Sequence, residues 1–531
     1  MRSAAIAAVA AFAVSASPAA AATFEHAGRY TPTRAAATPY TLIQLTQPGA
    51  ALSPDLRGAG ARLVAPGLDV WRVRSSRAGA VARALARDGS LGAVEPDQRL
   101  VEFNHLSAGD PLIPSEWWIP AIGADRVEPP GPGVPVTVVD TGVDMTHPEF
   151  ASRPSTILLN RQSIDGPEDV HGTMVSSVVG APANGIGIVG VYPRATLQEW
   201  DFGGASLGEV LASLDAATRR GRSVVNMSGG FFTYSALLER AVDRAVSRGV
   251  LVVAAVGNER EKGNTEAFPA TLPHVLTVAA TNEASRVASF STRSSANDLA
   301  APGQNIPVAV PTASNASGYS VEDGTSFSAP LVAGAAAWVW TQRPTLDVTQ
   351  IADVMRDSAR DVGAKGWDAD TGFGILDIPN ALAVPARPPD PGEPNDDVNV
   401  VRPFSLTTAG EPPLVGPKAR AGTIRASVDA VKDPDDVYRV WLPAGGRIYA
   451  RLHGTANVDL ALWGPRTHTI FERGAAAHRD LLSFSQRPGR ATDVVHARSK
   501  WRRGVYAYLD VFPGRHVSSA YYTLSVATSL R

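Results

Sequence analysis

Residues 136–139 read Val-Thr-Val-Val, a short apolar run of mostly β-branched side chains that ends at the acidic residue Asp140. Two later runs have the same character: Ser-Val-Val-Asn at residues 223–226 and Val-Leu-Val-Val-Ala at residues 250–254. Stretches with the apolar spacing of amphipathic helices separate these runs, at residues 207–220 and 235–248. Short buried strands that alternate with helices are typical of a parallel sheet. From Pro135 onward the sequence therefore predicts an α/β fold.

The chain has 531 residues and no cysteine. At about 150 residues per domain, this length suggests about three or four modules. The lack of cysteine excludes disulfides, thiolate zinc sites, iron–sulfur clusters and a cysteine nucleophile. The net charge of −2 argues against a nucleic-acid partner, but it combines three unlike blocks. Basic and acidic residues number 11 and 7 over residues 1–109, 18 and 30 over residues 110–385, and 20 and 14 over residues 386–531.

The N-terminus has the pattern of a secretory signal peptide, predicted over residues 1–22. Arg2 supplies a positive start, residues 4–14 are apolar, and residues 19–22 are small. A membrane span would need about 20 apolar residues, and polar residues interrupt this run well before that length. We therefore expect a secreted protein without a membrane span.

Two further modules flank the α/β region. Residues 39–103 combine alternating strand patterns with a helical stretch that ends at Gly89, which predicts a small α+β unit. The Pro-rich residues 386–398 indicate a linker. Beyond the linker, runs of alternating apolar and polar residues are separated by turn residues, which predicts a β-sandwich. These runs lie at residues 436–442, 447–452, 505–509 and 521–526.

Four polar residues stand at the ends of predicted elements in the α/β region. Asp140 and Asn258 each follow a strand, His171 opens a helix-like run, and Ser326 precedes a helix that is apolar all round. Taken singly, each has an ordinary structural explanation as a turn former or a helix cap. Taken together, they are an acid, a base, a nucleophile and an amide donor, the groups that acyl transfer requires.

The order Asp140, His171, Ser326 is that of the subtilisins, and the surrounding motifs resemble those of the subtilisin-like serine proteases (subtilases). Val-Val-Asp140-Thr-Gly-Val-Asp, His171-Gly-Thr-Met-Val and Gly-Thr-Ser326-Phe-Ser-Ala-Pro resemble the three triad motifs, and Ala-Val-Gly-Asn258 resembles the oxyanion segment. The resemblance covers residues 110–385. It implies that Ser326 attacks the scissile carbonyl, His171 moves the proton, Asp140 orients His171, and Asn258 binds the oxyanion. Protein or peptide substrates are expected.

The same resemblance implies two further sets of residues. Substrate-pairing segments would be formed by Ser228, Gly229, Gly230, Ala255, Val256 and Gly257. A structural calcium ion would be held by Asn184, Ile186, Ile188 and Glu149. The run from Gly185 also fits G-x-G-x-x-G, but it does not follow a predicted strand, as a dinucleotide-binding loop would.

Departures from the family pattern leave the triad untouched. Met174 stands where a second histidine is common, while Phe327 and Leu331 replace a usual methionine and histidine. Gly229 stands where a larger residue is frequent, which leaves the subsite preference open.

The flanking modules also resemble known families. Residues 23–109 resemble the inhibitory propeptide of subtilases, an intramolecular inhibitor that would be released by self-cleavage between Leu100 and Asp110. Residues 399–531, together with Glu393-Pro-Asn-Asp396 in the linker, resemble the bacterial pre-peptidase C-terminal domain. We expect a monomer.

Two other functions are compatible with parts of the sequence. Asp140-Thr-Gly and Asp370-Thr-Gly are the two triplets that an aspartic protease needs, although that class is largely β. A secreted binding protein on an inactive protease scaffold is the second alternative. Neither accounts for the retention of His171, Asn258 and Ser326 together.

Overall fold

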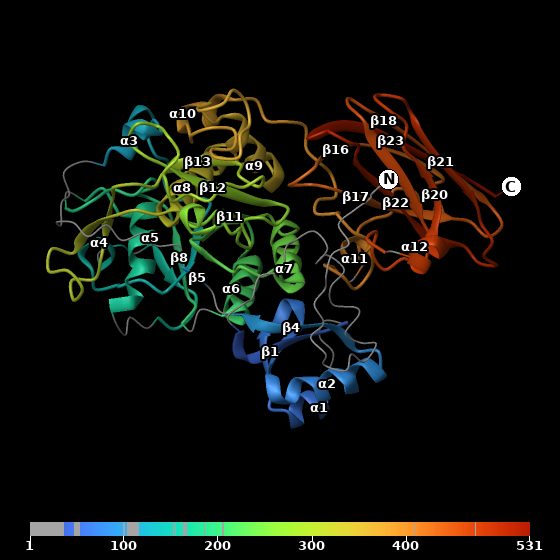
Figure 1. Cartoon of the computed structure of the whole chain (residues 1–531), viewed down its shortest axis with the longest axis horizontal. Helices are drawn as coiled ribbons and strands as arrows, with labels where there is room; N and C mark the ends of the chain where they lie inside the picture. Colours follow the sequence, from blue (N-terminus) through green and yellow to red (C-terminus); the bar gives the residue numbers. More distant parts are fainter. Residues whose placement is uncertain are drawn as a thin grey trace.

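The computed structural model describes residues 37–46, 54–98, 101–102, 116–151, 153, 155–162, 167–184, 186–203, 206–407, 409–472 and 474–530. The predicted signal segment, residues 1–22, lies outside this set. Within the set, no helix is both long enough and apolar enough to cross a bilayer. In chain order, a small N-terminal unit (residues 37–98) is followed by an α/β unit and then by a C-terminal unit (residues 398–530); in Figure 1 the α/β unit is at the left, the C-terminal unit at the right and the N-terminal unit below.

A seven-stranded sheet in the order β13-β12-β11-β9-β6-β8-β7 forms the centre of the α/β unit, and all its neighbouring strands are parallel. The predicted parallel sheet is thus confirmed. Every side chain of β6, β9 and β11 is buried, so the sheet is covered on both faces. The strands are β6 (Val136–Asp140), β7 (Thr156–Leu158), β8 (Leu197–Asp201), β9 (Ser223–Met227), β11 (Val250–Ala255), β12 (Val275–Thr281) and β13 (Leu299–Pro302).

Two pairs of helices cover this sheet. α5 (His171–Gly180) contacts α8 (Thr325–Gln342), while α6 (Leu207–Arg220) contacts α7 (Ala236–Val246). α8 is buried from Thr325 to Trp340, as its uniformly apolar sequence predicts. The shorter elements of the unit are α3 (Trp118–Ala121), α4 (Pro148–Ala151), α9 (Val348–Asp357), α10 (Ile378–Ala383), β10 (Gly229–Gly230), β14 (Ile306–Ala309) and β15 (Tyr319–Glu322).

The N-terminal unit is an antiparallel sheet in the order β2-β3-β1-β4 with two helices, and it lies against α6 (Figure 1). Its own apolar core contains Ile43, Leu56, Val73 and Leu85. Its elements are β1 (Ala37–Leu45), α1 (Pro54–Gly58), β2 (Arg62–Ala65), β3 (Val70–Arg74), α2 (Ser75–Arg87) and β4 (Leu91–Gln98). A separate short strand, β5 (Val101–Glu102), follows β4.

The C-terminal unit contains two four-stranded antiparallel sheets, in the orders β16-β23-β18-β21 and β17-β22-β19-β20. One apolar core draws on both sheets; it includes Leu452 and Leu524 of the first and Leu460 and Leu509 of the second. The strands are β16 (Ala421–Asp429), β17 (Asp436–Leu442), β18 (Arg447–Gly454), β19 (Val458–Trp463), β20 (Leu481–Ser485), β21 (Asp493–Arg498), β22 (Val505–Pro513) and β23 (Ser519–Ser529). Two short helices, α11 (Val398–Val401) and α12 (Gly474–Asp480), complete the unit.

Candidate active site

Four of the predicted residues lie where elements of the α/β unit begin or end. Asp140 is the last residue of β6, and Asn258 comes shortly after β11. His171 is the first residue of α5, and Ser326 is the second residue of α8. The carboxyl ends of parallel strands share one edge of a sheet, and in open α/β folds this edge is where ligands bind.

Asp140 and His171 form a buried pair. Asp140 Oδ1 lies 2.7 Å from His171 Nδ1, and the two residues are 2% and 1% exposed. The backbone N–H of Thr141 donates a second hydrogen bond, of 2.9 Å, to the same carboxylate oxygen. The approach depends on Gly172, because a Cβ atom there would lie 2.1 Å from the carbonyl oxygen of Gly142. A carboxylate at Nδ1 places a proton on that nitrogen and leaves Nε2 as the basic atom of the ring.

Ser326 is held at the N-terminus of α8 by reciprocal contacts with Ser228. The Ser326 hydroxyl donates to the carbonyl oxygen of Ser228 at 3.0 Å, and the Ser228 hydroxyl donates to the carbonyl oxygen of Ser326 at 2.8 Å. The ring of Phe327, the next residue, lies 6.2 Å from the ring of His171. Phe327 thus brings the start of α8, where the dipole favours negative charge, close to the ring of His171.

Asn258 has its two amide atoms in different environments. Its Oδ1 accepts hydrogen bonds from the backbone N–H and the hydroxyl of Thr325, at 3.0 and 2.9 Å. Its Nδ2 is buried, and among the described residues it has no hydrogen-bond partner. Anchoring the oxygen to α8 fixes the amide and leaves its N–H groups available. A fixed, dry donor of this kind can stabilise an oxyanion that develops beside it.

The predicted substrate-pairing residues fall into two groups. Gly229 and Gly230 form β10, which pairs antiparallel with β5: Gly229 faces Glu102, and Gly230 faces Val101. Residues 101–102 of the same chain are therefore already paired with the backbone of this strand. Ala255, Val256 and Gly257 run from the end of β11 to Asn258, and the N–H of Gly257 donates to the Thr325 hydroxyl at 3.3 Å.

The predicted calcium loop folds around Glu149. One oxygen of this buried carboxylate accepts hydrogen bonds from the N–H of Ile188 at 3.0 Å and from the Tyr319 hydroxyl at 2.9 Å. Its other oxygen, Oε2, is buried without a hydrogen-bond partner among the described residues. Asn184 is used locally, since its Oδ1 accepts from the N–H of Ile186 at 3.0 Å.

The structure adds one carboxylate to this loop that sequence reasoning missed. Glu116 accepts from the N–H of Val189 at 3.0 and 3.2 Å. Burial raises the pKa of Glu116 to about 7, and the negative charge of Glu149 adds to that shift. Two neighbouring carboxylates, one of which raises the pKa of the other, are a reasonable setting for a cation. In the sequence, the only sign that Glu116 could belong to this site is that its side chain is acidic.

The aspartic-protease alternative is not supported by the positions of its two aspartates. Asp370 Oδ1 lies 2.7 Å from Arg260, and its other oxygen lies 3.5 Å from Arg293. Asp140 is instead engaged with His171. An aspartic dyad requires two carboxyl groups that share a proton, so this alternative is wrong.

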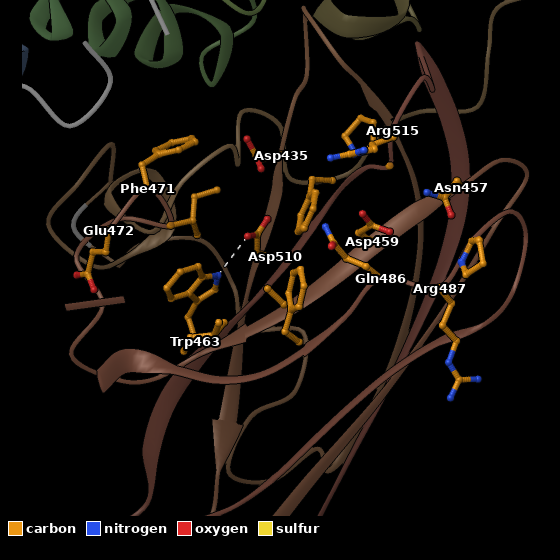
Figure 2. Close-up of a pocket in the computed structure, with 18 of the residues that line it drawn as sticks. Asp435, Asn457, Asp459, Trp463, Phe471, Glu472, Gln486, Arg487, Asp510 and Arg515 are labelled. Atoms are coloured by element: carbon orange, nitrogen blue, oxygen red, sulfur yellow. Dashed lines mark hydrogen bonds between the residues drawn. The ribbon is translucent and has the colours of Figure 1, made fainter. Parts of the chain in front are cut away.

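A cavity of about 1050 Å³ lies in the C-terminal unit, away from these residues (Figure 2). Aromatic and acidic side chains line it, and the indole N–H of Trp463 donates to Asp510 at 3.1 Å. None of the four predicted catalytic residues lines this cavity. Its size therefore does not mark the catalytic site.

Comparison with known proteins agrees with the geometry. A sequence model of the Subtilase family matches residues 131–374. Subtilisin E of Bacillus subtilis (strain 168) is 32% identical over 290 residues, which are 53% of this chain and 73% of that protein. Subtilisin Savinase of Lederbergia lenta is 35% identical over 254 residues, which are 46% of this chain and 92% of that protein.

The fold has a solved counterpart in fervidolysin from Fervidobacterium pennivorans, a keratinolytic enzyme related to subtilisin. The two structures align with a TM-score of 0.58 and 22% identity, over 88% of this chain and 70% of fervidolysin. At this identity the likeness concerns the fold alone. Together with the sequence relatives, it shows that the chain belongs to the subtilase family of serine proteases.

Proposed function

We propose that this subtilisin-family serine endopeptidase cleaves peptide bonds with Ser326 as nucleophile, His171 as general base and Asp140 as its orienting carboxylate. The observation that carries the proposal is the 2.7 Å contact between the buried side chains of Asp140 and His171, and the 6.2 Å distance between the rings of His171 and Phe327, the neighbour of Ser326, supports it. His171 would take the Ser326 proton as the hydroxyl attacks the substrate carbonyl, and would then pass it to the leaving amine. Asp140 would stabilise the imidazolium formed in between.

The tetrahedral intermediate carries a negative oxygen that the site can bind. We assign this role to the Asn258 side-chain N–H groups and to the backbone N–H of Ser326, at the start of α8. The Asn258 amide is already oriented by Thr325, so no reorganisation is needed when the charge develops. In subtilisin itself, loss of the corresponding donor costs about 3–4 kcal/mol of transition-state stabilisation.

We further propose that the chain is exported and made as a zymogen, with residues 23–109 acting as its own inhibitor. The antiparallel pairing of β5 with Gly229 and Gly230 supports this, because it occupies the strand that an extended substrate would use. Self-cleavage between Leu100 and Asp110 would release this segment. We also propose that residues 1–22 are the signal peptide that directs export.

Contacts of the N-terminal unit with the α/β unit support the inhibitor role. Asp97 accepts from the N–H of Gly208 at 2.8 Å, in the first turn of α6. Glu95 accepts from the N–H of Leu237 at 3.0 Å and from the Ser235 hydroxyl, at the start of α7. Each acid thus accepts hydrogen bonds from N–H groups at a helix N-terminus that have no partner within the helix.

A structural calcium ion is proposed at the loop of residues 184–188. The buried, unpartnered Oε2 of Glu149 fits a cation, and Glu116 supplies a nearby second carboxylate. The Asn184 amide oxygen and the carbonyl oxygens of Ile186 and Ile188 would complete the ligands. Such an ion would stabilise the fold without taking part in the reaction.

The C-terminal unit is proposed as a β-sandwich accessory domain of the pre-peptidase type, joined by the linker of residues 386–398. The shared apolar core of its two antiparallel sheets supports this arrangement. The substrates proposed are proteins or peptides, cleaved by a monomer.

Replacement of Ser326 by alanine tests the proposed mechanism. Ser326→Ala should abolish casein hydrolysis and leave the chain as an uncleaved precursor. Ser328→Ala is the matched control, because Ser328 is equally buried two residues further along α8 but donates to Ala301 at 3.0 Å. A Ser326→Ala chain that still cleaves casein would rule out the assignment, as would activity blocked by pepstatin rather than by a serine-directed phosphonate.

A further inference from the structure

One sheet of the C-terminal unit, β16-β23-β18-β21, packs one face into the core and turns the other to solvent (Figure 1). Exposed and buried residues alternate along β18, which places Arg447 and Arg451 on the solvent side. The strand register adds Arg498 of β21, directly opposite Arg447, and Arg425 of β16, opposite Thr523 of β23. All four arginines are exposed. We call this side of the sheet the basic face.

The positive charge of the basic face is not balanced by acids. Arg447 and Arg498 are direct cross-strand neighbours, and like charges in that position destabilise a sheet. None of the four guanidinium groups forms an ion pair with a described residue. Among the solvent-side positions of the four strands, all of which are described, Asp429 is the only acid, and its Oδ1 accepts from the N–H groups of Val431 and Lys432. The face is therefore suited to bind a negatively charged partner.

A hollow of about 510 Å³ deepens the basic face beside the linker. Arg425 and His453 line it from the strands, and Arg490 lines it from the loop between β20 and β21. Asp390 of the linker also lines the hollow, but one oxygen of this carboxylate accepts from the N–H and the hydroxyl of Ser427, at 2.7 and 2.6 Å. An acidic side chain can therefore enter the hollow between two guanidinium groups.

The residue types of the basic face indicate carboxylate groups on a protein partner. The basic side chains of these four strands are arginines and histidines, without a lysine. A guanidinium group binds a carboxylate through two parallel hydrogen bonds, which a lysine ammonium cannot do. Tyr449 and Tyr521 stand on the same face, 44% and 40% exposed. Surfaces that bind proteins are enriched in arginine and tyrosine and depleted in lysine, so this composition favours an acidic polypeptide.

Two other kinds of polyanion fit the basic face less well. Tyr449 is paired with Ala527 of β23, and Tyr521 lies further along that strand, about 20 Å from Ala527. Successive bases of a single-stranded nucleic acid need aromatic side chains at closer spacing. An anionic bilayer could not follow the surface into the hollow, and the only large apolar side chains that these described strands expose are the two tyrosines. An extended polypeptide can follow the face and enter the hollow.

We propose that the basic face is an exosite, a binding surface outside the active site, that holds acidic segments of the enzyme's polypeptide substrates. This inference rests on the proposed protease function. The α/β unit carries 18 basic and 30 acidic residues over residues 110–385, so it repels acidic chains. A basic surface on the C-terminal unit offsets that repulsion and raises the local concentration of such chains. Acidic proteins are therefore the expected preferred substrates.

Binding of an acidic peptide to the full chain with Ser326→Ala tests the exosite without any turnover. The probe is a fluorescent peptide of alternating glutamate and serine, followed by fluorescence anisotropy. Arg447→Gln together with Arg451→Gln should raise its Kd about tenfold, the order expected for the loss of two exposed ion pairs. Arg466→Gln together with Arg487→Gln is the matched control: it removes the same charge from exposed positions that follow β19 and β20 of the other sheet, and it should leave the Kd unchanged. Salt at about 1 M should abolish binding to the parent.

Kinetics of the active enzyme test whether the basic face selects substrates. The acidic substrate is succinylated casein, in which carboxylates replace the lysine ammonium groups. Its KM should rise about tenfold in the double variant Arg447→Gln and Arg451→Gln, with kcat unchanged, because the exosite binds substrate away from the reacting bond. Casein with amidated carboxyl groups and a short chromogenic peptide should be cleaved alike by the variant and the parent.

The outcomes separate the exosite from the protease function. Equal loss of peptide binding in the two double variants would show that net charge alone acts and would overturn the proposal. A parent chain that binds an oligonucleotide or phosphatidylglycerol vesicles but not the acidic peptide would also overturn it, as would an unchanged KM for succinylated casein. A parent chain that binds the peptide but cleaves neither casein nor the chromogenic peptide would refute the protease function rather than the binding surface.

Discussion

Replacing Asp140 by asparagine should disable the enzyme while leaving its shape intact. The Asp140 carboxylate accepts from His171 Nδ1 at 2.7 Å and from the N–H of Thr141 at 2.9 Å through the same oxygen. An amide that keeps its oxygen toward Thr141 loses the negative charge beside the imidazole. An amide that turns its NH₂ toward His171 forces the other tautomer, in which Nε2 can no longer accept the serine proton. Both outcomes disable the base.

The expected loss is large. The corresponding substitution in a serine protease of another fold lowers kcat about 10⁴-fold. At about 1.4 kcal/mol per factor of ten, this is about 5 kcal/mol of transition-state stabilisation. The assay is the initial rate of hydrolysis of a chromogenic peptide, with the rate of self-cleavage of the freshly refolded chain as a second readout. Both rates should fall by a similar factor.

Asp144→Asn provides the control for this experiment. Asp144 lies four residues further on, and its Oδ1 accepts from the N–H and the hydroxyl of Thr146 in a local turn. Its replacement should cost about 1 kcal/mol of stability at most and should leave the rate nearly unchanged. An Asp140→Asn enzyme within tenfold of the parent, or equal losses in both variants, would refute the assigned role of Asp140.

Three further predictions concern the oxyanion, the inhibitor and the loop ion. Asn258→Ala should lower kcat about 10²- to 10³-fold with little change in KM, as measured with the same chromogenic peptide. Burial raises the pKa of Glu95 to about 7 in the docked state, so docking favours the protonated acid. Docking of the N-terminal unit should therefore be strongest below pH 4.5 and should weaken by a factor on the order of a hundred as the pH rises to 7. Glu95→Gln should flatten this pH dependence in an inhibition assay with the separate N-terminal segment. EGTA should lower the melting temperature of the chain, since an ion present at about 100 times its Kd contributes about 3 kcal/mol, and Glu149→Gln should abolish the effect.

The four candidate catalytic residues can be recognised in the sequence because each stands at the end of a strongly patterned element. Asp140 follows a buried strand, and Ser326 precedes a helix that is apolar on every side. Such patterns are local, so the edge of the sheet where they meet can be inferred without coordinates. The parallel sheet is predictable for the same reason.

The residues that sequence reasoning missed act over long separations. Glu116 lies 73 residues from its partner Val189. Glu95 lies 142 residues from the N–H of Leu237, to which it is bonded. Nothing in the local pattern of either acid distinguishes it from an exposed one.

The attachment site of a fluorophosphonate tests the central claim most directly. The reagent phosphonylates an activated serine, so the treated protein can be digested and the modified peptide sequenced by mass spectrometry. The account predicts one adduct per chain, on Ser326, with loss of labelling in the Asp140→Asn variant. An adduct on another residue, or no adduct on protein that hydrolyses casein, would contradict it.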